Sequence, residues 1–400
     1  MASKEKISAK RADAMPRVIF VLQGGGALGA YHIGAYQALE EAGYLPDWVA
    51  GTSIGAINAA VIAGNQPGDR MQKLEELWNE ISWAGDWGEH LSGESRRLYN
   101  MGSNMEALLF GQPNFFVPRF PSPYCAPAGT PGATSFYDTA PLRSTLELFV
   151  DFDIINSKKV RLSLGTTQVR TGSMKFFDNT CTKKGLTAEH VMASGSLPPG
   201  FPAVQIEGEL YWDGGCVSNT PLEAILADDP GGSLLVFMID LWDAHGPAPQ
   251  TMDEVFWRQK QIQYASRTTQ QIEATAKRRN LRHSLGLLAS HLPDEALRIP
   301  AVQDALAQTS KAKMDIVHII YHPGSDQISQ SDAEFSRPSI AERRASGYAD
   351  MTLALAKKPW LEPVPEHVGA VVHSIKGGEI LSRIPTVKAS LQLGEARFMP

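Results

Sequence analysis

RVIFVLQGGG at residues 17–26 and WVAGTSIGAINAAVIAG at residues 48–64 decide the fold of this 400-residue chain. Each stretch begins with β-branched and aromatic residues that predict a buried strand, and each strand runs into glycine. Small and apolar residues then recur at helical spacing from Ala27 until Gly43, and a second helix is expected from Ala56 to Ala63. Two successive strand–loop–helix units predict a parallel sheet covered by helices.

The same α/β pattern returns later in the chain. Residues 84–136 first interrupt it with many Gly, Pro and aromatic residues and little periodicity, which is typical of a loop or lid-like insertion. Beyond this insertion, we expect a helix near 141–150, a hairpin over 168–177, a long helix over 252–288, and strands near 160–165, 208–213, 233–241 and 316–321. Gly246, Pro247 and Pro249 indicate a boundary between the core and a C-terminal part.

Composition and charge exclude several classes of protein. The chain is 43% hydrophobic and 20% charged, which is enough apolar material for a globular core, and its net charge of −6 argues against a nucleic-acid partner. Cys125, Cys181 and Cys216 are too few and too widely spaced for a disulfide framework or a metal site, which fits a reducing, cytoplasmic compartment. Residues 1–16 lack the hydrophobic stretch of a secretory signal, and residues 48–64 are too short and too weakly apolar to span a membrane.

The first glycine loop is open to three interpretations. Gly24, Gly26 and Gly29 fit the GxGxxG fingerprint of dinucleotide-binding proteins, with Asp47 as a candidate ribose ligand. The same backbone amides, at the start of a helix, are equally suited to hold the negative oxygen of a tetrahedral acyl intermediate. A glycine turn that only permits close packing of strand and helix is the third possibility.

The second loop favours acyl chemistry. Gly51-Thr52-Ser53-Ile54-Gly55 is a GxSxG sequence between a strand and a helix, the context in which this motif forms a nucleophile elbow. The helix dipole at this position favours developing negative charge on the Ser53 hydroxyl. A serine nucleophile still requires a base.

An aspartate is the candidate base. His32, His190, His318 and His322 all lie in settings typical of core or surface histidines. Asp213, in contrast, ends an aromatic strand and precedes Gly214 and Gly215. It can accept a proton if apolar surroundings raise its pKa, and its alternative role is an Asp-Gly turn between two strands.

Four blocks taken in order resemble the patatin-like phospholipase family, in particular a bacterial subgroup with a C-terminal extension. The blocks are Gln23–Ala30 (QGGGALGA), Gly51–Gly55 (GTSIG), Ala193–Pro202 (ASGSLPPGFP) and Asp213–Gly215 (DGG). The resemblance covers about Arg17 to Leu241. It implies a three-layer α/β/α fold with a mostly parallel central sheet over residues 17–242, preceded by a disordered tail at 1–16 and followed by a mainly helical extension of unknown role at 243–400.

The resemblance also implies a mechanism without cofactor or metal. Ser53 is then the nucleophile and Asp213 the base, and the oxyanion hole is formed by the amides of Gly24, Gly25 and Gly26. The remaining motif glycines are Gly29, Gly51, Gly55, Gly214 and Gly215. The resulting hypothesis is a serine lipid acyl hydrolase that cleaves carboxylic esters of lipids through an acyl-enzyme.

Two alternatives stay open at this stage. One is a non-catalytic lipid-binding or partner-binding protein on the same fold, and the other is an oxidoreductase that uses the Gly24 loop to bind a dinucleotide. The sequence leaves the head group, the acyl length and the oligomeric state undetermined.

Two further features concern the substrate and its location. Aromatic residues between 83 and 137 predict either a lid or acyl-chain wall, or core packing under a long loop; they are Trp83, Trp87, Phe110, Phe115, Phe116, Phe120 and Tyr124. Between residues 258 and 283, seven basic residues accompany the single acid Glu273. A basic helix of this kind either lies on an anionic membrane, which would place the protein peripherally on a lipid surface, or forms a solvated helix face.

Overall fold

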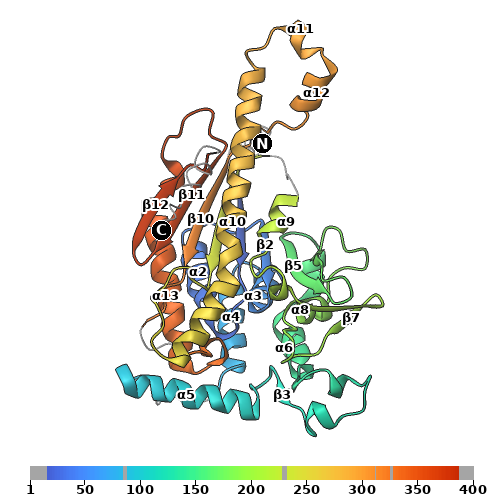
Figure 1. Cartoon of the computed structure of the whole chain (residues 1–400), viewed down its shortest axis with the longest axis vertical. Coiled ribbons are helices and arrows are strands. Elements are labelled where there is room, and N and C mark those ends of the chain that lie inside the picture. The colour runs from blue at the N-terminus through green and yellow to red at the C-terminus, as the bar shows by residue number, and fades with distance from the viewer. Residues whose placement is uncertain (1–15, 84–87, 228–231, 311, 325–327, 387–400) are drawn as a thin grey trace, which may run out of the picture.

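The computed structural model describes residues 16–83, 88–227, 232–310, 312–324 and 328–386. The tail expected at residues 1–16 therefore lies, except for Pro16, outside the described residues. The described chain forms a ten-stranded sheet in the order β12-β11-β10-β9-β1-β2-β5-β8-β7, with β6 also paired to β5 (Figure 1).

The centre of the sheet is parallel and its edges are antiparallel. The parallel strands are β1 (Arg17–Leu22), β2 (Trp48–Thr52), β5 (Arg161–Gln168), β9 (Leu234–Asp240), β10 (Met314–Ile320) and β11 (Ala370–Lys376). The strands that pair antiparallel to this set are β6 (Met174–Asp178), β7 (Val204–Ile206), β8 (Glu209–Asp213) and β12 (Glu379–Arg383). A separate short pair is formed by β3 (Val117–Pro118) and β4 (Tyr137–Asp138).

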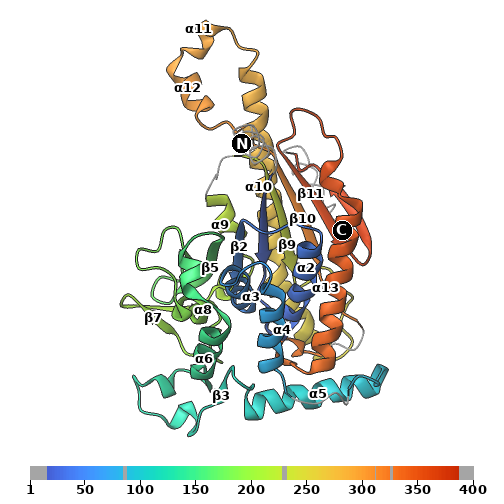
Figure 2. The same cartoon turned by 180° about the vertical axis from the view of Figure 1, so that it is seen from behind.

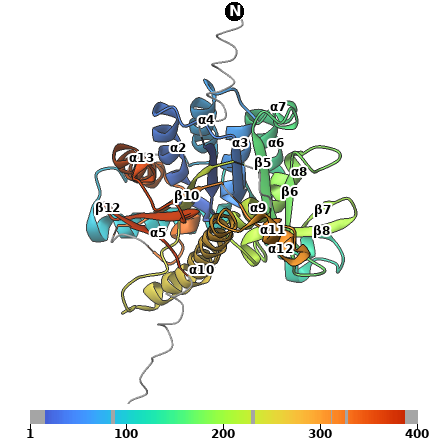
Figure 3. The ribbon, with the colours of Figure 1, turned by 90° about the horizontal axis from the view of Figure 1, so that it is seen from above.

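The sheet has an apolar core on each face, and successive side chains of β1 point alternately into one core and the other. Phe20 and Leu22 belong to the larger core, whereas Ile19 and Val21 belong to the smaller one, because successive side chains of a strand point to opposite faces. The larger core is covered by α2 (Ala30–Glu41), α3 (Ile54–Ala63), α4 (Arg70–Glu80) and α13 (Arg337–Lys357), and the smaller by α9 (Leu222–Ala227) and α10 (Met252–Ala289). Figure 3 shows α2, α3, α4 and α13 on one side of the sheet and α10 on the other, which confirms the three-layer fold.

Most elements expected from the sequence are present. The helix near 141–150 is α6 (Ala140–Phe149), the long helix is α10, and the hairpin is formed by β5 and β6. The first helix begins later than expected, because Gly26–Gly29 forms a 3-10 turn, η1, before α2. The other short helices are α7 (Phe152–Asn156), α8 (Ala188–Ser194), α11 (Asp294–Leu297) and α12 (Pro300–Leu306).

The expectation that residues 84–136 lack regular structure was wrong. The segment contains α5 (Gly93–Phe110), which lies across one end of the molecule (Figure 1). The buried positions of this helix include Arg96, Asn100 and Asn104. Apolar residues do recur at helical spacing in this segment, at Leu98, Met101, Met105 and Leu109, but they lie on the exposed face of the helix.

The C-terminal part is mainly helical, as expected, but it also extends the sheet. The sequence predicted one strand at 316–321, and the structure has three, β10, β11 and β12. Because β10 pairs with β9 in parallel, residues on both sides of the expected boundary at 242–243 contribute neighbouring strands to one sheet. Figure 2 shows α13 beside α2, so the C-terminal part is packed against the N-terminal part on the helical layer too.

Two smaller observations complete the description. In the described parts of the chain, no helix combines the length and the apolar character needed to cross a membrane. Cys125, Cys181 and Cys216 are all free and exposed.

Candidate active site

Ser53 occupies a tight turn between β2 and α3. Its backbone has φ 57° and ψ −127°, a conformation that a residue with a side chain rarely adopts. The turn is crowded: a Cβ at Gly51 would lie 2.2 Å from the carbonyl oxygen of Gly55, and a Cβ at Gly55 would lie 2.2 Å from that of Leu22. Both motif glycines are therefore required by close backbone approach, as the GxSxG context predicts.

A serine from the third motif block holds this turn. The Ser53 amide donates to the carbonyl oxygen and the hydroxyl oxygen of Ser194, each at 3.1 Å, and the Ser194 hydroxyl donates to the carbonyl oxygen of Gly165 at 2.6 Å. Ser194 is fully buried. The sequence placed this residue in a motif block but did not predict that it anchors Ser53.

Asp213 lies at the end of β8, with its side chain against Ser53. The carboxylate is buried and accepts a hydrogen bond from the Gly215 amide at 2.7 Å, and the Ser53 hydroxyl lies close enough to interact with it. Burial raises the pKa of Asp213 to about 7, although the interactions with Ser53 and with the Gly215 amide act in the opposite direction. Gly214 packs so closely that a Cβ there would lie 2.7 Å from the carbonyl oxygen of Gly165. Asp213 thus lies in surroundings where a carboxyl group can exchange a proton near neutral pH.

The glycine loop faces the same point from the end of β1. A Cβ at Gly24 would lie 2.9 Å from the Cβ of Ser53, so the two loops are in contact. The Gly24 carbonyl oxygen accepts from the Asn219 side-chain amide at 2.8 Å and from the Trp242 indole N–H at 2.9 Å. Since the N–H of a trans peptide points opposite to its carbonyl, these two donors also determine the direction of the Gly25 N–H.

The three amides of this loop are not equivalent. The Gly24 N–H donates to the carbonyl oxygen of Asn219 at 3.1 Å. The N–H groups of Gly25 and Gly26 have no acceptor among the described residues. Of the three glycines that the sequence assigned to an oxyanion hole, only Gly25 and Gly26 therefore have amides available to bind a ligand. The remaining motif glycine, Gly29, packs against Ile54 at the start of α3.

Gln23, the residue before the loop, links it to the end of β9. Its side-chain oxygen accepts from the amides of Leu241 and Trp242, at 2.6 and 3.2 Å. Its side-chain nitrogen donates to the Thr220 hydroxyl at 2.8 Å. Trp242 and Asn219 were not singled out in the sequence, although Trp242 lies two residues after the buried parallel strand β9, at a strand end where site residues commonly gather.

An apolar cavity of about 300 Å³ opens beside Ser53. Ser53, Asp213 and the three loop glycines belong to its lining. The remaining wall is mainly apolar and aromatic, and its residues include Ile54, Ile57, Leu108, Phe115, Phe116, Tyr137, Leu197, Phe201 and Phe335. The ring centroids of Phe116 and Phe201 are 5.1 Å apart, so segments distant in sequence close the wall together.

The aromatic residues of the insertion separate into two groups. Phe115 and Phe116 are buried in the cavity wall, as expected for an acyl-chain wall. Phe110, Phe120 and Tyr124 are instead exposed, at 67%, 99% and 88%. Trp83 forms an isolated bridge with Ser336, and Trp87 lies outside the described residues.

The C-terminal part completes the cavity. Asp332, Ala333 and Phe335, in and after the 3-10 turn η5 (Ser331–Ala333), contribute to its lining. A Cβ at Gly26, which has φ +54°, would lie 2.1 Å from the carbonyl oxygen of Asp332, so η5 rests directly on the glycine loop.

A buried arginine joins η5 to the loop. Arg343 of α13 donates to the carbonyl oxygens of Ala27 at 3.1 Å and Glu334 at 2.8 Å, and it pairs with the Glu334 carboxylate at 3.4 Å. Arg343 and Glu334 are 3% and 1% exposed. This buried pair holds the C-terminal segment against the site, a role for which the sequence carried no signal.

The candidate histidines lie elsewhere. Burial lowers the pKa of His32 to about 3, and its ring contacts Asn58. His190 caps α8, and His318 pairs with Asp240 at 2.8 Å inside the sheet. His322 is exposed and lies near Asp243. None of these four residues is among those that line the cavity.

The position of Asp47 argues against the dinucleotide-binding interpretation, in which this residue would bind the ribose. Asp47 precedes β2, where its carboxylate accepts from the Val18 amide at 2.9 Å. The glycine loop follows the opposite, carboxyl end of the neighbouring strand β1. Asp47 therefore lies across the length of the sheet from the loop that it would have to complement.

The basic residues of α10 are largely used inside the molecule. Lys260 pairs with Asp332 at 2.6 Å, and Lys277 pairs with Glu273 at 3.7 Å. Backbone carbonyl oxygens accept from four further basic residues, Arg258, Arg267, Arg279 and Arg282. Six of the seven basic residues thus have partners within the chain.

The geometry describes an α/β protein with a serine turn, a buried aspartate and a glycine loop gathered at one cavity. A family model described as patatin-like phospholipase matches residues 20–226, and the chain belongs to this family. A second model, described as patatin phospholipase, matches residues 262–367, which include η5 and all of α13.

Individual relatives match only in part. An uncharacterised NTE family protein of Mycobacterium tuberculosis is 28% identical over 220 residues, which is 54% of this chain and 29% of the relative. A patatin-like phospholipase domain-containing protein of Caenorhabditis elegans is 23% identical over 89% of this chain and 25% of the relative. The chain thus spans less than a third of the length of these relatives. Among solved structures, VipD from Legionella pneumophila is 15% identical with a TM-score of 0.34, over 86% of this chain and 67% of VipD.

Proposed function

We propose that this protein is a serine lipid acyl hydrolase that cleaves carboxylic ester bonds of lipids. The observation that carries the proposal is the position of Ser53 beside the buried Asp213 carboxylate, where both residues line one largely apolar cavity. Membership of the patatin-like phospholipase family supports lipid hydrolysis in general. The apolar wall supports a substrate with an acyl chain.

In the proposed first step, Asp213 accepts the proton of Ser53 while the Ser53 oxygen attacks the ester carbonyl carbon. The carbonyl oxygen becomes an oxyanion, to which the N–H groups of Gly25 and Gly26 donate. Removing one oxyanion donor of this kind typically costs about 3 kcal/mol of transition-state stabilisation. The N-terminus of α3 adds favourable potential at the same place.

Collapse of the tetrahedral intermediate expels the alcohol, which takes the proton from Asp213 and leaves Ser53 acylated. A water molecule then gives a proton to Asp213 and attacks the acyl carbonyl. The second collapse releases the fatty acid and returns the proton to Ser53. A base with a pKa near 7 can both accept and return this proton at neutral pH.

The test compares two serine variants. Ser53→Ala should retain the fold but lose hydrolysis of a p-nitrophenyl ester, and it should no longer react with a fluorophosphonate probe, because only an activated serine reacts quickly. Ser173→Ala, which removes an exposed serine in the β5–β6 turn, is the matched control and should keep both properties. Retained turnover by purified Ser53→Ala protein would contradict the proposal, and absence of labelling in the wild type would favour a non-catalytic lipid-binding role.

A further inference from the structure

Helix α5 exposes several large apolar residues and buries three polar ones. Arg96, Asn100 and Asn104 are 7%, 3% and 5% exposed. The opposite face carries Leu98, Met101, Met105 and Leu109, which are 64%, 48%, 52% and 59% exposed. A surface helix of a globular protein normally shows the reverse arrangement. The apolar face of α5 is therefore not what attaches the helix to the protein.

Buried polar contacts hold the helix in this orientation. Arg96 donates to the carbonyl oxygen of Gly88 at 2.8 Å and to the Ser339 hydroxyl at 3.0 Å. Further along the helix, the Asn104 side chain donates to the carbonyl oxygen of Gln330 at 3.0 Å. Rotating α5 to bury its apolar face would leave these polar groups without partners, which is costly for buried groups. The outward direction of the apolar residues is thus built into the fold.

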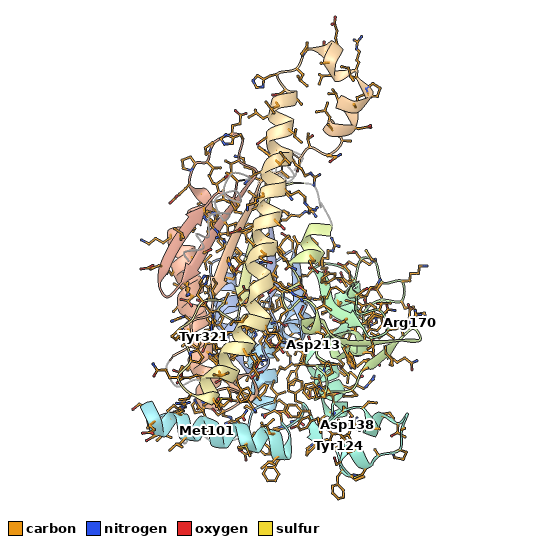
Figure 4. The ribbon with its side chains drawn as sticks, in the orientation of Figure 1. Met101, Tyr124, Asp138, Arg170, Asp213 and Tyr321 are labelled. Atoms are coloured by element: carbon orange, nitrogen blue, oxygen red, sulfur yellow. The ribbon has the colours of Figure 1, made fainter. Side chains whose placement is uncertain are left out.

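The exposed apolar residues continue from α5 into the loop that follows it. We call this surface the apolar end face; it consists of Leu98, Met101, Met105, Leu109, Phe110, Val117, Phe120, Tyr124 and Phe136. Figure 4 shows Met101 and Tyr124 at the same end of the molecule, with Asp213 further inside. Between residues 98 and 136, the charged residues are Glu106 and Arg119, and Arg119 is paired with Asp138 at 3.2 Å.

The other side of this segment is a wall of the candidate active site. Leu108 of α5 lines the cavity beside Ser53, as do Phe115 and Phe116. The Tyr137 hydroxyl donates to the Leu108 carbonyl oxygen at 2.8 Å, which ties the two ends of the segment together. The apolar end face and the apolar cavity are therefore the outer and inner sides of one short stretch of chain.

We propose that the apolar end face docks the protein on the surface of a lipid bilayer. The inference rests on the proposed function, since an ester substrate with long acyl chains resides in such a surface. A helix lying across one end of the molecule, with aromatic residues beside it, presents a broad surface suited to a planar interface (Figure 1). Continuity with the cavity favours lipid over a protein partner, because an acyl chain that leaves the bilayer meets apolar side chains on its way to Ser53.

The charge of the apolar end face indicates which kind of bilayer it would bind. The apolar end face offers few charged groups to an anionic head group, and the basic residues of α10 belong to a different element. Docking through this face depends on apolar burial, which salt does not screen. The structure thus favours binding to an uncharged, zwitterionic surface with little dependence on ionic strength.

The experiment measures flotation with phosphatidylcholine vesicles in a Ser53→Ala background, so that the lipid is not consumed. The Ser53→Ala protein should float with the vesicles equally at about 0.05 and about 0.5 M NaCl. Adding Met105→Glu and Phe120→Glu should reduce binding by about tenfold or more, because both charges would enter the bilayer interface. The matched control, Leu288→Glu with Leu361→Glu, changes residues of similar exposure (66% and 70%) elsewhere and should bind as before.

Two results would overturn the docking proposal. One is equal vesicle binding by the end-face variant and its control. The other is a wild-type dimer that the end-face variant converts to a monomer, since the face would then be covered by a second copy of the chain. With Ser53 intact, the end-face variant should hydrolyse a soluble short-chain ester normally but lose hydrolysis of vesicle lipid. Vesicle binding without turnover of any ester would instead contradict the proposed function and leave docking intact.

Discussion

Replacing Asp213 by Asn should abolish ester hydrolysis and, at the same time, stabilise the fold above neutral pH. Burial raises the pKa of this carboxyl from 3.8 to about 7, so the folded protein carries an unfavourable buried charge once the pH exceeds that value. Asn keeps the shape and can still accept from the Gly215 amide. Its side-chain N–H can donate to the neighbouring Ser53 hydroxyl.

The magnitude follows from the shift in pKa. Between pH 3.8 and about 7, the folded protein binds a proton at Asp213 that the unfolded chain has lost, so the free energy of unfolding falls as the pH rises through this window. A pKa shift of about three units corresponds to a loss of about 4 kcal/mol in the free energy of unfolding. The full loss is reached above about pH 8, and roughly 2 kcal/mol of it is already lost at about pH 5. Asp213→Asn should recover most of this free energy at the higher pH.

The assay is urea unfolding of the wild type, Asp213→Asn and Ser53→Ala at about pH 5 and about pH 8. Ser53→Ala is the informative control, because it should be equally inactive yet keep the buried carboxyl and gain no such stability at the higher pH. The kcat/KM of the wild type should rise about tenfold per pH unit below pH 7 and level off above it. An Asp213→Asn variant no more stable than the wild type at the higher pH, or a gain that does not change with pH, would refute the argument.

Two further substitutions test how the glycine loop is held. Trp242→Phe removes one of the two donors to the Gly24 carbonyl oxygen, so kcat for a soluble ester should fall by about tenfold with little change in KM; an unchanged kcat would show that Asn219 alone orients the loop. Arg343→Met leaves the Glu334 carboxylate buried without its cation, which should cost about 3–5 kcal/mol of unfolding free energy and lower the melting temperature. Adding Glu334→Gln should restore part of that loss, and a double variant no more stable than Arg343→Met would contradict the assigned pairing.

Much of the fold was predictable because it follows from local patterns. The strands β1, β2, β5, β8 and β9 are short apolar or aromatic runs that end at glycine or polar residues, and such runs signal buried strands without further information. Helix α10 was equally clear from its length. In contrast, α5 was missed although its apolar residues recur at helical spacing, because Gly, Pro and aromatic residues dominate the segment that contains it. Strand β11 was missed because His373 and Ser374 interrupt its apolar run.

The candidate site, too, has a part that was predictable from the sequence and a part that was not. Ser53 and the glycines around it were predictable, because a strand that turns sharply into a helix needs small residues at fixed spacing. The loop amides were not distinguishable in sequence. Only the carbonyl of Asn219, which is brought to the loop by a segment almost 200 residues later, occupies the Gly24 N–H and leaves Gly25 and Gly26 available.

The sequence by itself determined the class of sheet, the serine turn, the carboxylate and the family resemblance, since each of these is written in neighbouring residues. Tertiary structure alone decided what surrounds them: the burial that raises the pKa of Asp213, the closure of the cavity by η5 and Arg343, and the outward apolar face of α5. The physical reason is that burial and partner choice depend on segments far apart in the chain. A local pattern specifies which side chain is present, but it does not specify whether distant segments will bury that side chain or leave it exposed.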